Sequence, residues 1–444
     1  MTPPRSTGHT DGMKYLAIPA LLALMAGAGP LKAEPTADAA LALRALQAAC
    51  PVADATMAVA VLRDAAGEEA AGEAQIQPIE LGLGLAGWQA TLGLREGGTI
   101  RLSRLASGAS LQRAVVEIDR PAGPGLPPQP TLQARAERDC ARLEGRALLR
   151  RADGSPEAVT LLDEKLEPTG TRLPLDADVP PGVDPGGVTV ALLDTGVNYL
   201  RPKIAERLAR RADGAIVGYD FEDDDARPFD ANVALSPFHP GRHGTLVANA
   251  LLDEAAALRL VPLRFPRSDP ARLEQAVALA ADAGASILLV GVGGRRAEDW
   301  QGFAAAMRAH PGLLAIVSAG RDGEDIDDRA WYPAALELPN MLVVGAADGF
   351  GQPVRSNWGL RRVDILAPAE RLIVRDFDDV EQAVAGAEFA AARIAALATR
   401  LLAAEPALTA GELKARLLSM ARLSDHGARP RSAYGVVPEE ALAR

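Results

Sequence analysis

The sequence contains few of the residues on which several kinds of site depend. Only two of its 444 residues are cysteine and five are histidine, which excludes a zinc site built from cysteines. Aromatic residues make up only 4%, which argues against a stacking platform for nucleic-acid bases. The formal net charge of −11 argues against nucleic acid or anionic lipid as the main partner. Apolar residues, at 48%, are by contrast frequent enough for a sizeable core.

An apolar run near the N-terminus, YLAIPALLALMAGAG at 15–29, follows Lys14. A basic residue, a short apolar segment and a small residue at Ala33 are typical of a secretory signal peptide, here residues 1–33. The run is shorter than the roughly 20 residues of a membrane span, so no integral span is expected after cleavage. An uncleaved anchor is the alternative. The chain is therefore predicted to be exported, to the periplasm or beyond, and Met13 is a candidate start beside Met1.

Export places the two cysteines, Cys50 and Cys140, in an oxidising compartment. An even pair of cysteines in such a compartment predicts a disulfide between them. Two unrelated buried thiols are the alternative.

The region 34–172 is predicted to be a small α+β unit. Leucines at helical spacing predict a helix over 37–49, and short alternating runs such as MAVAVLRD and GTIRLSRL predict strands between 56 and 119. The segment RPAGPGLPPQP at 120–130 is typical of a linker or a long loop. The segment TLQARAERDCARLEGRALLRR at 131–151 predicts a further helix. We find no set of catalytic residues in this region.

A second segment rich in proline and glycine, 173–187, predicts a linker before a different kind of domain, 188–444. Continuous apolar runs now alternate with helical patterns, which predicts a parallel α/β sheet with helices on its faces. The predicted strands span 187–196, 255–264, 285–294, 313–320 and 341–348.

Two motifs of this domain contain residues suited to catalysis. Asp194 ends the first apolar run, where a carboxylate serves as a metal ligand, a catalytic aspartate or a plain helix cap. His243 precedes a helical apolar pattern, and a single histidine there is more often structural than catalytic. Since chemistry in parallel sheets occurs at the carboxyl ends of the strands, both residues are nevertheless candidates.

Taken together, D-T-G at 194–196 and H-G-T at 243–245 resemble motifs of the subtilisin-like serine proteases, the subtilase family, whose order is aspartate, histidine, serine. Other segments resemble the family's acidic loop, substrate-binding strand, oxyanion turn and nucleophile helix. These are YDFEDDDARPFD (219–230), GVGG (291–294), SAGRDG (318–323) and GAEFAAARIAALATRLL (386–402). The resemblance implies a subtilisin-like parallel sheet flanked by helices, preceded by the smaller α+β region.

The sequence departs from the family pattern at the residues that would perform the chemistry. Glu388 stands at the position of the serine nucleophile, and Arg321 at that of the asparagine that stabilises the oxyanion. The resemblance implies substrate binding at Gly291 and Gly293, although Gly291 stands where a serine is usual. A carboxylate has no proton to give at neutral pH and attacks amides poorly, so peptide cleavage is not expected.

Opposite charges at these positions predict an ion pair between Glu388 and Arg321. Glu388 is also expected to meet the imidazole of His243 opposite Asp194, and two carboxylates would raise the pKa of that imidazole. The residue types Asp, His and Glu also suit a metal site, but in this fold they would form a line, so no metal is predicted there. The segment EDDDARPFD could bind calcium, although its composition favours a solvated acidic loop, and no other cofactor is expected.

The sequence therefore predicts an exported subtilisin-like pseudoprotease that binds a peptide or a protein partner without cleaving it. One alternative is an active subtilisin-like serine endopeptidase with an unrecognised nucleophile. The other is an envelope scaffold that makes its contacts through the N-terminal region.

Overall fold

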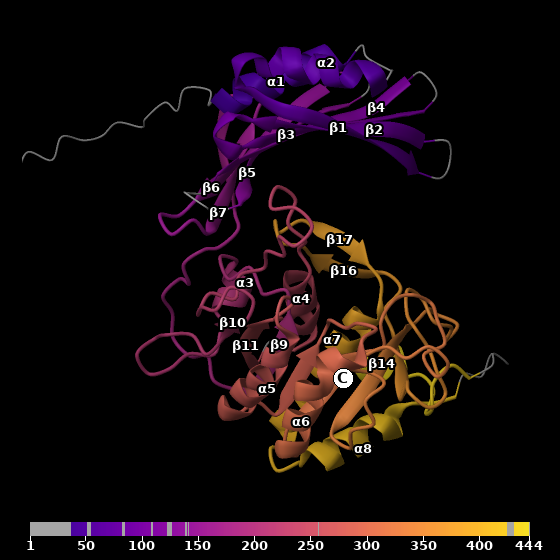
Figure 1. The fold of residues 1–444 in the computed structure, drawn as a ribbon. Helices are drawn as coiled ribbons and strands as arrows, with labels where there is room; N and C mark the ends of the chain where they lie inside the picture. The colour runs from indigo at the N-terminus through magenta and orange to yellow at the C-terminus, as the bar shows by residue number, and fades with distance from the viewer. Residues whose placement is uncertain are drawn as a thin grey trace, which may run out of the picture.

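The computed structural model describes residues 37–50, 55–81, 85–107, 110–121, 127–137, 140, 142–255, 257–423 and 430–443. The chain forms two parts, and in Figure 1 the indigo-to-magenta N-terminal part lies above the C-terminal part. The predicted signal peptide lies outside the described residues. Within the ranges given above, no helix has both the length and the apolar character that a membrane crossing requires.

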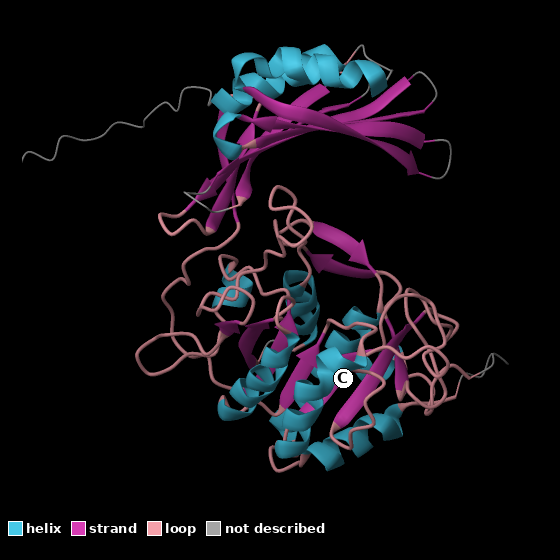
Figure 2. Ribbon diagram, in the orientation of Figure 1, coloured by secondary structure: helices cyan, strands magenta, loops and turns pink. Residues whose placement is uncertain are grey.

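The N-terminal part is an antiparallel sheet with two helices across one of its faces (Figure 2). The eight strands pair in chain order, from β1 to β8, so the sheet is a meander. In β3, Ile100 and Leu102 are buried on the face that packs against the helices. The elements are α1 (Ala37–Ala49), α2 (Ala55–Ala66), β1 (Ala70–Leu81), β2 (Leu85–Leu94), β3 (Thr99–Ser107), β4 (Ser110–Pro121), β5 (Pro128–Glu137), β6 (Arg142–Arg150), β7 (Pro156–Leu162) and β8 (Pro168–Pro174).

The helix predicted over 131–151 is wrong, because this segment forms the antiparallel strands β5 and β6. Alanine, leucine and arginine favour helices intrinsically, and the prediction rested on that preference. In the sheet, however, Leu132, Ala134 and Ala136 alternate with polar residues and are buried. Period-2 burial and pairing with two neighbouring strands outweigh the intrinsic preference.

The strand predicted at MAVAVLRD, 57–64, is also wrong, because the segment lies in helix α2. Ala58, Leu62 and Ala65 recur at helical spacing and are buried against the sheet. The helix predicted over 37–49 is confirmed as α1. Of the predicted linker or loop 120–130, residues 120–121 end β4 and residues 128–130 begin β5, while residues 122–126 lie outside the described residues.

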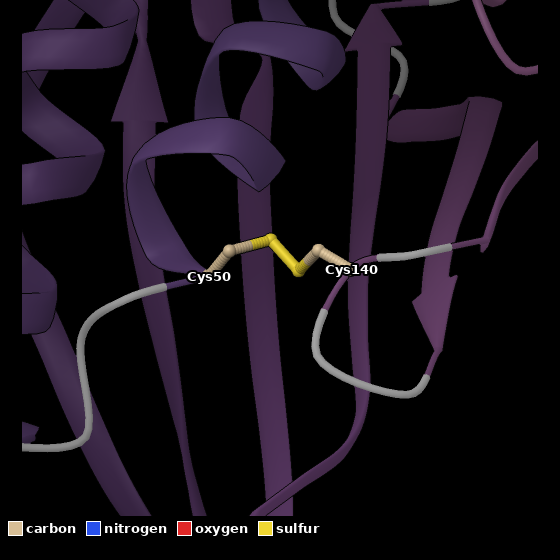
Figure 3. Close-up of a disulfide and its surroundings, with 2 residues drawn as sticks. All are labelled: Cys50 and Cys140. Atoms are coloured by element: carbon tan, nitrogen blue, oxygen red, sulfur yellow. A yellow bond between two sulfur atoms is a disulfide. The ribbon is translucent and has the colours of Figure 1, made fainter.

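The predicted disulfide between Cys50 and Cys140 is confirmed (Figure 3). Cys50 directly follows α1, and Cys140 lies between β5 and β6, with 6.1 Å between their Cα atoms. The bridge ties the helical layer to the sheet across 90 positions of sequence. A disulfide of this kind indicates an oxidising compartment outside the cytoplasm.

The C-terminal part contains a seven-stranded sheet in the order β10-β11-β9-β12-β13-β14-β15. All its pairs are parallel, which confirms the predicted fold class. Its strands are β9 (Val188–Asp194), β10 (Tyr219–Asp220), β11 (Leu258–Arg264), β12 (Ile287–Val290), β13 (Leu314–Ser318), β14 (Met341–Ala347) and β15 (Ile365–Pro368). Its helices are α3 (Pro202–Ala205), α4 (Gly244–Glu254), α5 (Leu273–Asp282), α6 (Gln301–Ala309), α7 (Ala387–Ala404), α8 (Ala410–Met420) and α9 (Glu439–Leu442).

Both faces of this sheet are buried, which explains why its strands appear in the sequence as continuous apolar runs. In β9, Val190 and Leu192 belong to the core shared with α4 and α7. Ala191 and Leu193 belong to the core shared with α5 and α6. A separate antiparallel hairpin, β16 (Leu372–Arg375) with β17 (Glu381–Val384), lies on the side that faces the N-terminal part (Figure 1).

The two parts are joined by direct contacts as well as by the chain between β8 and β9. Val159 of β7 and Leu175 belong to the same buried core as α4 and α7. Arg146 of β6 donates a hydrogen bond of 2.7 Å to the carbonyl oxygen of Phe238. The segment that contains Phe238 thus connects the C-terminal part to the free face of the N-terminal sheet.

Candidate functional site

The structure brings most of the predicted site residues to the carboxyl edge of the parallel sheet. Asp194 is the last residue of β9, and His243 directly precedes α4. Glu388 lies in the first turn of α7, whose long apolar face is buried behind the sheet. Gly291 and Gly293 directly follow β12. This edge is where parallel α/β sheets place their ligands.

Asp194 and His243 form a direct hydrogen bond. The Nδ1 atom of His243 lies 2.7 Å from Oδ1 of Asp194, which also accepts the backbone N–H of Thr195 at 2.7 Å. Asp194 is fully buried, and its Oδ2 atom has no hydrogen-bond partner among the described residues. The Asp194 carboxylate therefore holds Nδ1 of the imidazole, so Nε2 is the nitrogen that faces away from Asp194.

A second carboxylate, which the sequence analysis did not single out, positions the backbone of His243. Asp230 is fully buried and accepts the hydroxyl of Thr195 at 2.7 Å and the backbone N–H of Thr245 at 2.9 Å. The Thr195 hydroxyl in turn accepts the N–H of Gly244 at 2.8 Å. Burial raises the pKa of Asp230, although the bonds from Thr195 and Thr245 act in the opposite direction. The only sequence signal was the position of Asp230 at the end of the acidic segment.

Glu388 faces the other nitrogen of the imidazole. Its Oε1 atom lies 3.8 Å from Nε2 of His243, and the residue is 5% exposed. The carboxylate folds back over Gly386, where a Cβ atom would come within 2.7 Å of both carboxylate oxygens. Gly386 is the N-cap of α7, so the positive end of the helix dipole stabilises the negative charge. The local fold is thus suited to a carboxylate at this position.

The two carboxylates control the protonation of His243. Burial by itself lowers the pKa of the imidazole, but the charges and hydrogen bonds of Asp194 and Glu388 outweigh it. The net result is a pKa well above the ordinary value of histidine. This direction favours the protonated imidazole, which lies between the side chains of Asp194 and Glu388.

Replacing Glu388 with glutamine is expected to lower the pKa of His243, because one of the two carboxylates that raise it is removed. The folded-state pKa lies above the unfolded value of about 6.5, so the protonated imidazole stabilises the fold fully below that pH. This contribution is lost as the pH rises through the folded-state pKa, and in E388Q the loss is expected at lower pH. NMR titration of the imidazole and thermal unfolding across pH measure both effects.

The exposed Glu337 offers a matched control, since E337Q removes the same charge at the surface. An unchanged His243 titration in E388Q would contradict the assignment of Glu388 as a partner of the imidazole.

The predicted ion pair between Glu388 and Arg321 is absent. Arg321 is exposed, and it makes no ion pair or hydrogen bond with the side chain of Glu388 in the described ranges. Arg321 follows Gly320, whose φ of +87° turns the chain at the end of β13. A guanidinium at the surface keeps its hydration, whereas pairing with Glu388, which is already buried, would require Arg321 to lose that hydration. Glu388 instead lies 3.8 Å from Nε2 of His243, whose pKa is raised.

Gly291 fits tightly against the site. A Cβ atom at this position would collide with Oδ2 of Asp194 and would lie 3.6 Å from Cε1 of His243. The backbone at Gly291, directly after β12, therefore packs against the side chains of Asp194 and His243.

Replacing Gly291 with alanine is expected to displace the Asp194 carboxylate and to lower the free energy of unfolding by about 1–3 kcal/mol, as overpacking of a core does. The pKa of His243 should fall as well, since Asp194 raises it. Chemical denaturation and NMR titration test these two effects. Gly312→Ala is the control, because a Cβ there meets nothing within 4 Å; equal results for both variants would refute the expected clash.

The carboxylates of the acidic segment 222–230 are largely paired with arginines. Asp223 pairs with Arg264, and Asp224 with Arg272. Asp225 pairs with Arg227 at 2.5 Å. In the described ranges, no group of three or more His, Cys, Asp or Glu side chains is arranged to hold a metal ion.

The arrangement of Asp194, His243 and Glu388 also differs from that of a metal centre. The two carboxylates contact opposite nitrogens of one imidazole, so their oxygens do not converge on a common point. The three side chains form a line in which a hydrogen bond joins buried Asp194 to His243 and a 3.8 Å ion-pair contact joins His243 to buried Glu388. Lines of this type orient a histidine toward a reacting group in serine hydrolases.

Comparison with known proteins identifies this architecture. Residues 186–436, more than half of the chain, match the model of the Subtilase family. The chain belongs to the subtilase family. The match covers every predicted site residue outside the disulfide.

Among curated proteins, the chain is 28% identical over 231 residues to the thermophilic serine proteinase of Bacillus sp. strain AK1, covering 48% of this chain and 52% of that protein. It is 25% identical over 260 residues to the alkaline serine exoprotease A of Vibrio alginolyticus, covering 56% of this chain and 45% of that protein. The chain thus spans about half the length of these relatives. A crystal structure of a cold-adapted subtilisin-like serine proteinase matches 60% of this chain and 93% of its own, with 24% identity and a TM-score of 0.47.

Proposed function

We propose that this chain is an exported subtilase-fold pseudoprotease that holds an extended segment of a protein partner without cleaving it. The position of Glu388 is the observation that supports the proposal most directly. Its carboxylate, 3.8 Å from Nε2 of His243, occupies the side of the imidazole on which a subtilase needs its serine hydroxyl. No serine hydroxyl in the described ranges is hydrogen-bonded to His243.

The protonation state of His243 gives a second reason against hydrolysis. A subtilase histidine must accept the proton of the nucleophile, and it can do so only while it is neutral. Here the carboxylates of Asp194 and Glu388 hold the pKa of His243 well above its ordinary value, although burial opposes them. Both carboxylates thus favour the protonated imidazole, which cannot accept a proton from a nucleophile.

The position that the family uses for an oxyanion donor gives a third reason. Arg321 is exposed and stands where the resemblance places an asparagine. Loss of one such donor lowers kcat by about 10²–10³ in a subtilisin, a relative of this chain. The missing nucleophile, the raised pKa of His243 and the altered donor position thus all oppose turnover.

The backbone beside the site supports peptide binding. The N–H of Gly291 bonds to β9, and Gly294 pairs with Tyr332, but Val292 and Gly293 between them make no backbone–backbone hydrogen bond within the described residues. An extended peptide can pair with such free groups as an added strand, which requires no nucleophile. We assign substrate-type binding to Gly293 on this basis, and to Gly291 through its carbonyl, which accepts no backbone hydrogen bond within the described residues.

We further propose that the region 34–172 stays attached to the subtilase domain through the linker 173–187. The linker makes several contacts with the domain that follows it: Asp176 pairs with Arg227 at 2.9 Å, and Tyr199 donates a bond of 2.6 Å to the carbonyl of Ala177. A domain that does not cleave peptides would also leave this connection intact. The predicted signal peptide and the disulfide support an exported protein.

Photo-crosslinking tests the proposal. A benzoylphenylalanine at Val292, beside the free backbone groups, is expected to capture decapeptides from a random synthetic pool, and the captured peptides should have their full length. The same group at Val183, an exposed linker residue, serves as the matched control. Shortened peptides would support the active-endopeptidase alternative. Capture at Val292 no greater than at Val183 would contradict peptide binding along the segment that follows β12.

A further inference from the structure

The indole of Trp331 fills the gap between the two chain segments that follow β12 and β13. A Cβ atom on Gly293 would come within 2.7 Å of the indole Cε2 atom. A Cβ atom on Gly320 would come within 2.8 Å of both Cε2 and Nε1. The Nε1–Cε2 edge of the indole therefore lies against the backbones of both Gly293 and Gly320. Neither glycine can be replaced by a larger residue unless the indole moves.

This gap lies next to the site described above. β12 and β13 are adjacent parallel strands, so the segments after them form two neighbouring walls at the carboxyl edge of the sheet. One wall begins at Gly291, where a Cβ atom would lie 3.6 Å from Cε1 of His243. A peptide paired with Val292 and Gly293 would direct a side chain between these walls. In this chain Trp331 already occupies that space.

Two sets of contacts hold Trp331 in place. The next residue, Tyr332, exchanges two backbone hydrogen bonds with Gly294, of 2.8 and 2.9 Å. The Arg295 guanidinium lies 5.0 Å from the centre of the Trp331 ring, a cation–π arrangement. These contacts attach Trp331 to the chain segment that follows β12.

Arg295 also ties the two walls together. Its guanidinium forms ion pairs with Asp322 and, at 2.5 Å, with Glu324. Both acidic residues belong to the segment that follows β13, whereas Arg295 belongs to the segment that follows β12. An arginine that bridges both walls and covers the ring makes opening of the gap costly, because two charge-assisted contacts would be broken.

From this geometry we infer that the segment after β12 selects a peptide with glycine at the residue facing the gap that Trp331 fills. The inference rests on the proposed peptide binding and specifies the kind of partner peptide that this segment accepts. A ligand side chain larger than a hydrogen would have to displace the indole and break the Arg295 bridge. A residue that does not fit a filled pocket binds at least about tenfold more weakly, by analogy with pockets that discriminate single methyl groups.

Selection of peptides from a random decapeptide library tests this inference. Wild-type protein is expected to enrich glycine about tenfold at one position of the aligned ligands. Trp331→Ala opens the gap, and its ligands should lose that glycine and gain large apolar residues there. Trp358→Ala is the matched control, since it removes an indole that stacks on Arg431 at 4.0 Å instead of on Arg295; it should keep the glycine preference.

Trp331→Phe covers the case in which Trp331→Ala does not fold. Phenylalanine keeps a ring beneath Arg295 but lacks the Nε1–Cε2 edge that contacts both glycines, so alanine should become acceptable at the selected position. The inference would be overturned if the ligands of wild type showed no glycine preference, or if Trp331→Phe kept the glycine preference of wild type. Peptide binding itself would stand in both cases. Failure of wild type to retain any peptide would instead count against both the proposed function and this inference.

Discussion

A double variant, Glu388→Ser with Arg321→Asn, is expected to react covalently with a small fluorophosphonate, in contrast to the wild-type chain. Serine in the first turn of α7 would place a hydroxyl on the Nε2 side of His243, and Asp194 would still orient the ring. With Glu388 gone, the pKa of His243 should fall, so that the imidazole can accept the serine proton. Intact-protein mass spectrometry would show one added probe per chain.

The expected gain is large because both substitutions restore parts on which subtilase chemistry depends. Loss of the serine lowers kcat on the order of 10⁶ in a subtilisin, and loss of the oxyanion donor costs about 10²–10³. A small probe is chosen because it places no side chain in the gap that Trp331 fills. Adding His243→Ala to the double variant is the control and should abolish labelling. A folded double variant that remains unlabelled would mean that the departures from an active site extend beyond these two residues.

Removing the disulfide with Cys50→Ser and Cys140→Ser is expected to destabilise the N-terminal part by about 4–5 kcal/mol. The bridge closes 90 positions of sequence, and the loss of chain entropy in the unfolded state scales with the logarithm of that length. Urea unfolding followed by hydrogen exchange and mass spectrometry resolves the two parts. Peptides from α1 and β5 should lose protection at lower urea, whereas those from β9 and α7 should change little.

The two parts serve as controls for each other in this experiment, since the bridge lies wholly within the N-terminal part. Equal shifts in both parts would mean that they unfold as one unit through the contacts near Val159 and Arg146. No shift in either part would contradict the view that the disulfide fastens the helical layer to the sheet.

The parallel sheet was the most predictable feature of the fold. Its strands are buried on both faces, so apolar runs such as the one that ends at Asp194 stand out in the sequence. The antiparallel sheet was less predictable, because only every second residue of its strands faces the core. At 131–151 the helix-favouring residues concealed that alternation, and at 57–64 β-branched and alanine residues suggested a strand where a helix packs.

Those features of the site that depend on short sequence motifs were predictable. Those that depend on contacts between residues distant in sequence were missed. The motifs point to Asp194, His243 and Glu388 as parts of one site, and the structure brings these three side chains together in a line. The predicted ion pair between Glu388 and Arg321 was wrong, because the exposure of Arg321 and the turn at Gly320 depend on the surrounding chain. Asp230 and Trp331 were not singled out, because their roles arise from contacts with residues distant in sequence.

The most direct test of the central claim is the mass of the wild-type protein after incubation with an excess of fluorophosphonate at neutral pH. With Glu388 in place of the nucleophile and the pKa of His243 raised, the mass is predicted to stay unchanged. An increase by one probe molecule, abolished by His243→Ala, would show an active serine beside this histidine and would contradict the account.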